Sequence, residues 1–146
     1  MLTIYRKIMY IFFFLKGRHY FLKTNFIDSL KYFTQAEKYY TEDYQLYVYK
    51  GLNEFFIKLF DNALISFQKA LSMIDANQKL NIDEKKYLKK YIIEYILISS
   101  TVVESFSSYG RYKNIYYNLE YKKDNINKNL LLDFPISDNN NLSKAT

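Results

Sequence analysis

An internal repeat with a period of about 34 residues constrains the fold more than any other feature of this sequence. Six positions in the first half of the chain recur at this spacing with the same or a similar residue. The pairs are Gly17 and Gly51, Phe13 and Tyr47, Phe26 and Phe60, Leu30 and Leu64, Phe33 and Phe67, and Ala36 and Ala70. A unit of this length cannot bury its apolar face alone, so neighbouring copies are expected to stack around a shared core.

The apolar residues inside each copy follow the spacing of an amphipathic helix. One stripe consists of Phe26, Leu30, Phe33 and Tyr40, and the matching stripe of Phe60, Leu64, Phe67, Leu71 and Ile74. Glycine and proline are nearly absent from residues 1–109, and short polar joints lie at 24–25, 41–43, 61–62 and 75–77. The sequence therefore predicts an all-α chain of long helices joined by short turns.

Small residues occupy the places where paired helices are expected to touch, at Gly17, Ser29 and Ala36 and at their counterparts one repeat later. Phe33 and Phe67 would fill the space between successive helices. A helix–turn–helix unit of this length and pattern resembles the tetratricopeptide repeat. The resemblance covers roughly residues 10–77 and implies a right-handed superhelix of antiparallel helical hairpins. The chain departs from the family pattern in having no Trp and in having Thr41 and Asp75 where proline commonly closes a repeat.

The second half of the chain predicts a third, degenerate hairpin. Residues 83–108 predict a long helix, residues 107–110 a break in it, and residues 112–123 a final helix. Residues 109–112 resemble the turn between the helices of a repeat, displaced by an insertion. We therefore expect a helical domain of about three hairpins over residues 1–124. A flexible, Asn-rich tail is expected over residues 125–146. A generic helical bundle is the alternative architecture.

Composition and motifs give little support for catalysis. The chain has no cysteine, which excludes thiol catalysis and cysteine-ligated metals, and His19 is its single histidine. The sequence contains no phosphate-binding glycine loop, HExxH or GxSxG motif, and no carboxylate stands near enough to His19 along a helix to orient it. We expect a protein that is not an enzyme and that uses no cofactor, metal or small-molecule substrate.

The resemblance implies a concave groove lined by the first helix of each hairpin. The partner-binding positions would be Phe14, Arg18 and Phe21, followed one repeat later by Val48, Leu52 and Phe55. Such an apolar groove suits a helix or an extended peptide, with Arg18 as a polar orienting group. The equal alternative is that the chain covers these residues itself, with its first eight residues or with residues 130–132 and Phe134. The expected function is a protein-binding adaptor, scaffold or chaperone-like module in the cytoplasm.

Three other roles stay open at this stage. Permanently buried apolar faces would make the chain a structural subunit of a larger or homo-oligomeric assembly. The net charge of +6, with Lys85, Lys86, Lys89 and Lys90 interleaved with Tyr87 and Tyr91, would suit nucleic acid. The apolar run at residues 8–15 is far shorter than the roughly 20 residues of a membrane span. We expect that run in a buried first helix, with secretion or membrane attachment through it as the alternatives.

Overall fold

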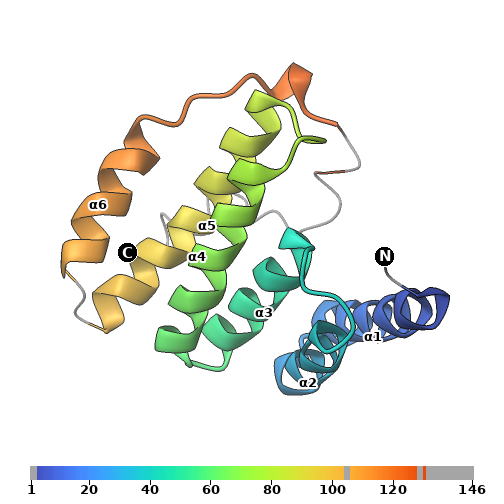
Figure 1. Ribbon diagram of the computed structural model, residues 1–146. Coiled ribbons are helices and arrows are strands. Elements are labelled where there is room, and N and C mark those ends of the chain that lie inside the picture. Colours follow the sequence, from blue (N-terminus) through green and yellow to red (C-terminus); the bar gives the residue numbers. More distant parts are fainter. Residues whose placement is uncertain (1–2, 104–105, 128–129, 131–146) are drawn as a thin grey trace.

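The computed structural model describes residues 3–103, 106–127 and 130. The regular elements among these residues are all helices, with no strand, which confirms the all-α class. The helices are α1 (Ile4–Leu22), α2 (Phe26–Glu37), α3 (Tyr44–Phe56), α4 (Phe60–Ala76), α5 (Ile82–Val102) and α6 (Phe106–Tyr117), followed by a short 3-10 turn, η1 (Lys123–Asn125). Each helix packs against the next, so three hairpins lie side by side in chain order (Figure 1).

The polar joints predicted at 24–25 and 41–43 cap helices, whereas the joint predicted at 61–62 is wrong, because these residues lie inside α4. The Asn25 side chain accepts a hydrogen bond from the Asp28 amide at the start of α2, and Asp43 accepts one from Gln45 at the start of α3. Asn81 and Glu84 form a reciprocal capping box at the start of α5. These bonds satisfy backbone N–H groups that a helix leaves unpaired at its first turn.

The turns inside the first two hairpins have the same backbone conformation. Thr24 and Lys58, which occupy the same position in successive repeats, are the only described non-glycine residues with a positive φ, at 58° and 69°. The Asn25 amide donates to the Tyr20 carbonyl over 2.9 Å, and the Leu59 amide donates to the Glu54 carbonyl over 2.7 Å. In both turns, a residue in the left-handed conformation follows the first helix, and the next amide bonds to the carbonyl five residues earlier.

The two hairpins also share one tight contact between a glycine and an aromatic ring. A methyl group on Gly17 would lie 2.8 Å from the Phe33 ring, and one on Gly51 would lie 2.6 Å from the Phe67 ring. These distances are too short for any side chain, so only glycine lets the paired helices come so close. The predicted close approach is confirmed in both hairpins.

A buried polar chain joins the first hairpin to the second. The Ser29 hydroxyl donates to the Gly17 carbonyl over 2.7 Å, and the Asn53 amide nitrogen donates to the Ser29 hydroxyl over 2.9 Å. Within the second hairpin, the Ser66 hydroxyl donates to the Glu54 carboxylate. Burial raises the pKa of Glu54, although the hydrogen bond from Ser66 opposes this shift.

The third hairpin differs from its prediction. Residues 107–110 lie inside α6, so the break predicted there is wrong, and the helices separate upstream, after Val102. The low helix propensity of serine and glycine is overridden because α6 packs onto α5 through the buried Tyr112 and through Tyr116. The Tyr116 hydroxyl donates to Glu94 on α5 over 2.8 Å. The final helix consequently begins and ends earlier than predicted.

Helix α3 lies at the centre of the molecule, with nine of its 13 residues buried, so it has little free surface. Its Tyr49 ring stacks on Phe33 of α2 at a centroid distance of 5.0 Å, and the Tyr95 ring of α5 stacks on Phe67 of α4 at 5.9 Å. Tyr95 thus corresponds to Tyr49, but it follows Tyr49 by more than one repeat length. The expected insertion is accommodated by α5, which has 21 residues against the 13 of α3.

Candidate interaction surfaces

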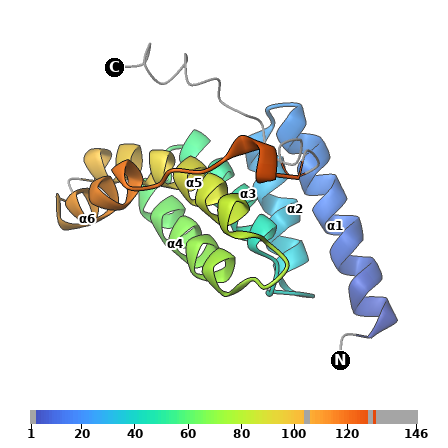
Figure 2. The same cartoon turned by 90° about the horizontal axis from the view of Figure 1, so that it is seen from above.

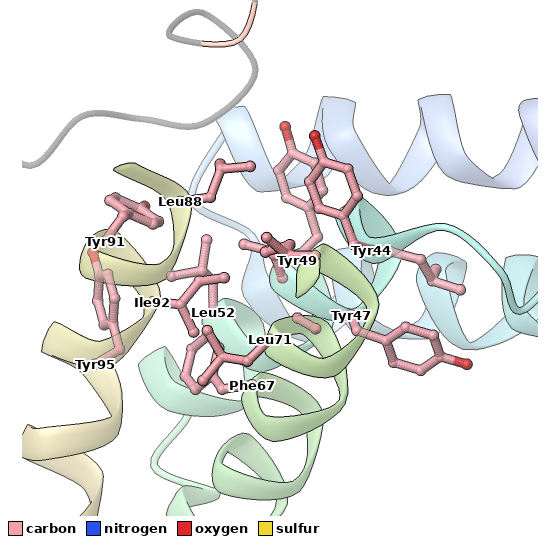
Figure 3. Packing of buried hydrophobic residues seen from close by; sticks show 14 of the residues in the cluster. Tyr44, Tyr47, Tyr49, Leu52, Phe67, Leu71, Leu88, Tyr91, Ile92 and Tyr95 are labelled. Carbon is pink, nitrogen blue, oxygen red and sulfur yellow. The ribbon is translucent and has the colours of Figure 1, made fainter. Parts of the chain in front are cut away.

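Three of the predicted groove residues belong to the core of the chain. Val48 and Leu52 are 0% exposed and Phe21 is also buried. Figure 3 shows Leu52 among the buried side chains of α3, α4 and α5. These three side chains belong to one buried cluster, which also contains Leu130. A partner cannot reach them in this arrangement.

The other predicted groove residues, Phe14, Arg18 and Phe55, are half-buried. The Phe14 ring lies 5.7 Å from the Tyr49 ring, and the Phe55 ring lies 5.0 Å from the Tyr95 ring. Both rings therefore help to hold one hairpin against the next while keeping part of their surface accessible.

Arg18 lies one helical turn after Phe14, and its Nε is buried without a hydrogen-bond partner in the structure. A buried guanidinium N–H without an acceptor is unfavourable, and a carbonyl or carboxylate oxygen would satisfy it. Sequence reasoning selected Arg18 for its position in the repeat. The missing acceptor is a separate structural feature of the same residue.

The outer face of α1 carries an exposed apolar stripe that sequence reasoning missed. Its members are Ile4, Ile8, Ile11, Leu15 and Leu22, each more than half exposed. They follow one another at spacings of three, four and seven residues, which places them along one side of the helix. We call this set the outer stripe. The expected burial of residues 8–15 is therefore wrong for Ile8, Ile11 and Leu15, because no helix in the described residues covers this side of α1.

The opposite end of the stack has a different surface. Figures 1 and 2 show α1 and α6 at opposite edges of the molecule. The exposed residues of α6 are mostly small, polar or charged: Ser107, Gly110, Arg111, Lys113, Asn114 and Tyr117. A polar outer face is what a terminal helix of a repeat stack needs in water, and α6 has one where α1 does not.

Residues 118–127, which we call the strap, return from α6 to the start of α5. Leu119 and Ile126 are buried, and the side chain of Asn125 donates to Asp83 over 2.7 Å. Hydrogen bonds from Asn125 and from the Lys122 amide hold the pKa of Asp83 below its ordinary value. The predicted tail thus begins with residues that contact the helical domain.

Leu130, one of the residues with which the chain is expected to cover the groove itself, is also buried. The rest of the predicted tail, residues 131–146 with Phe134, lies outside the described residues.

A pocket of about 560 Å³ lies between the strap and the start of α5. Its lining residues are Lys79, Leu80, Asn81, Glu84, Asp124, Asn125, Ile126, Asn127 and Leu130. Both carboxylate oxygens of Glu84 already accept hydrogen bonds, one from the Asn81 amide and one from the Asn127 amide. The main charged group on α5 in this pocket is therefore used to hold the strap.

The lysine–tyrosine pattern of α5 is largely used in internal contacts. Lys89 pairs with Asp75 over 2.9 Å, and Lys90 lies over the Tyr116 ring at 5.0 Å. Tyr91 is buried and Tyr87 packs edge-on against Tyr121. These tyrosines are not free to stack on bases, so the pattern is explained by packing of the third hairpin.

Metal-ligating side chains do not cluster in the part of the chain that the structure describes. That part holds no group of three His, Cys, Asp or Glu residues able to bind a metal ion. His19 is exposed and its ring contacts Tyr20 at 5.5 Å. None of the described helices has the length and apolarity to cross a bilayer. Comparison of the chain with protein-family models, with curated proteins and with solved structures finds no significant match.

Proposed function

We propose that the chain is a non-enzymatic protein-interaction module of the cytoplasm, built as a tetratricopeptide-like superhelix, which captures a peptide or helix. The equivalent turns at Thr24 and Lys58 and the equivalent contacts of Gly17 and Gly51 support this proposal. Stacked hairpins of this kind form rigid surfaces on which exposed side chains can hold a partner in a fixed orientation.

The unpaired Nε of Arg18 is the observation that carries the proposal. It lies next to the half-buried ring of Phe14, so one polar donor adjoins an apolar contact area. The Nε atom is buried, so the Arg18 side chain would have to change its conformation to donate to a carbonyl or carboxylate oxygen of a peptide whose apolar side chains cover Phe14. This arrangement combines a specific polar contact with burial of apolar surface, as in known peptide-binding sites.

Site-specific photo-crosslinking tests this proposal. A photoreactive phenylalanine derivative replaces Phe14 in one variant, which keeps Arg18, and the exposed Lys31 of α2 in a matched control. In extract of the native host, the variant at position 14 should crosslink to a discrete protein that the variant at position 31 does not capture. Crosslinking to the same proteins from both positions, or to none, would contradict capture at this site.

A structural-subunit role is the second candidate, because the outer stripe of α1 leaves apolar surface exposed. Such a subunit would assemble through this face with other chains or with copies of itself. Light scattering of the purified chain at micromolar concentration should then give a mass above that of the monomer, 17.7 kDa. A monomeric mass would show that the chain does not assemble with copies of itself under these conditions.

A further inference from the structure

We propose that the outer stripe of α1 docks on an anionic lipid surface, with α1 lying in the plane of the membrane. At the angular spacing of an α-helix, Arg18 falls at the edge of the outer stripe, beside the border on which Lys7 lies. The lipid contact is made by the apolar side chains of the stripe, however, and needs no protein partner.

The exposed apolar surface of the molecule is concentrated on α1. In the described residues, seven of the fourteen exposed large apolar side chains belong to this one helix. The outer stripe runs along nearly the whole of its 19 residues, from Ile4 to Leu22. Phe12 and Tyr5 extend the stripe on one side. The exposed His19 interrupts the face between Leu15 and Leu22, so its continuous part runs from Ile4 to Leu15. A helix with such an apolar face can lie at a lipid interface and insert that face among the acyl chains.

Positive charge borders the outer stripe on both sides. At the angular spacing of an α-helix, Lys7 falls on one border and Lys16 and Lys23 on the other. The ammonium group of Lys16 lies 5.1 Å from the Phe12 ring, at the edge of the apolar surface. Residues 1–27 contain no Asp or Glu. Lysine side chains that flank an apolar face can extend to lipid phosphates while their alkyl chains remain in apolar contact.

The same charges disfavour a second copy of this chain as the occupant. A symmetric contact through the outer stripe would place the lysines of one α1 near those of the other, with no carboxylate on either helix to neutralise them. An anionic lipid surface instead supplies negative charge to all of these lysines at once.

Tryptophan fluorescence of the full chain reports insertion directly, because the native sequence contains no Trp. Phe12→Trp places the reporter beside the outer stripe, and Ile65→Trp places it at an exposed position of α4 as a matched control. Vesicles of equimolar phosphatidylcholine and phosphatidylserine should shift the emission of the position-12 variant to the blue and leave that of the position-65 variant unchanged. An unchanged emission at position 12, or equal shifts at both positions, would overturn the proposal.

Flotation with the same vesicles tests the residues that carry the contact. We expect Ile11→Gln with Leu15→Gln to lower the partition coefficient by about tenfold or more, because two inserted side chains are lost. Lys7→Gln with Lys23→Gln should lower it by about fivefold for each lysine. Ile65→Gln should leave binding unchanged, and vesicles of phosphatidylcholine alone should bind the wild type more weakly.

Other outcomes of these experiments count against the proposal. Undiminished flotation of the Ile11→Gln, Leu15→Gln variant would show that another surface binds lipid. A wild-type dimer that this variant dissociates, together with no flotation of the wild type, would identify the outer stripe as an interface between copies. Helical circular dichroism of each variant verifies that the exposed substitutions leave the fold intact.

Discussion

The first two hairpins and the third hold their helices together in different ways. In the first two, a glycine of the first helix faces a buried phenylalanine ring of the second, at Gly17 and Gly51. In the third, Leu97 stands at the corresponding place in α5, and Gly110 has no neighbour within 4 Å of an added Cβ atom. Its helices are joined by Tyr112, Tyr116 and the strap instead. Without the close approach that glycine allows, a hairpin needs larger side chains and additional chain to complete its packing.

The largest difference between the hairpins is expected at the ring that faces the glycine. Phe67→Ala removes a fully buried ring that also stacks on Tyr95, so it should lower the free energy of unfolding by about 4 kcal/mol. Lys113, which corresponds to Phe67 in the third hairpin, is exposed, and Lys113→Ala should change that free energy by less than about 0.5 kcal/mol. Urea denaturation of both variants provides the comparison, and similar losses would contradict it.

Substitution of the glycines should have opposite effects in the second and third hairpins. Gly51→Ala places a methyl group against the Phe67 ring and should destabilise the fold by about 2 kcal/mol. Gly110→Ala adds a methyl group in open space inside an exposed helix and should stabilise the fold by about 1 kcal/mol at most. Thermal unfolding would show a decrease in Tm for the first variant and an increase for the second. A stabilising Gly51→Ala would disprove the tight contact.

A smaller effect is expected from carboxylates that link the helices of the second and third hairpins. Glu54 accepts a hydrogen bond from Ser66, and Glu94 accepts one from Tyr116. Burial raises the pKa of both carboxyls. The folded chain therefore holds these protons more tightly than the unfolded chain, and stability is lost as the pH rises through the raised pKa values.

Glu54→Gln keeps an oxygen that can accept from Ser66 but cannot ionise. It should stabilise the chain at pH 7 by less than about 1 kcal/mol, given solvent screening, and this difference should disappear below pH of about 4. Glu94→Gln should have a smaller effect, because Glu94 is less buried than Glu54. Urea denaturation between pH 4 and pH 7 would measure the change in unfolding free energy for both variants. A variant that is less stable than the wild type at pH 7 would contradict the raised pKa of the carboxyl it replaces.

The smallest effect is a local one at the strap, which only the third hairpin has. Asp83 accepts hydrogen bonds from the Lys122 amide and the Asn125 side chain, and these bonds lower its pKa. Their contribution should be present above the pKa of the unfolded carboxyl and be lost as the pH falls through the lowered pKa. Asp83→Asn should accelerate hydrogen exchange at the Lys122 amide while leaving global unfolding nearly unchanged. Unaltered exchange at Lys122 would show that Asp83 does not hold the strap.

The sequence predicted the first two hairpins well because their determinants are local and repeated. Gly17, Phe33 and Phe26 have counterparts in the second repeat, and the turns before Phe26 and Phe60 share one backbone conformation. The polar cap at Asn25 is not repeated, because Leu59 stands at its place. The third hairpin was less predictable because the insertion in α5 shifts its residues away from the 34-residue spacing of the first two repeats. There, the weak helix propensity around Gly110 indicated a break that packing of Tyr112 overrides.

The candidate surfaces were harder to predict than the helices. Val48 and Leu52 have the spacing of groove residues, but their burial depends on how successive hairpins close around α3, which is a long-range property. The outer stripe of α1 follows a helical period that is visible in the sequence. Its exposure depends on which helix lies at the edge of the stack, and no local pattern contains that information.

A double-mutant cycle at each glycine–ring pair tests most directly whether the first two hairpins are equivalent units. Gly17→Ala and Gly51→Ala are each measured alone and combined with Phe33→Leu or Phe67→Leu, using urea denaturation. Trimming the ring should relieve the clash, so both cycles should give a coupling energy of the same sign and of about 1–2 kcal/mol. Additive effects in either pair, or couplings of opposite sign, would contradict the equivalence of the two hairpins.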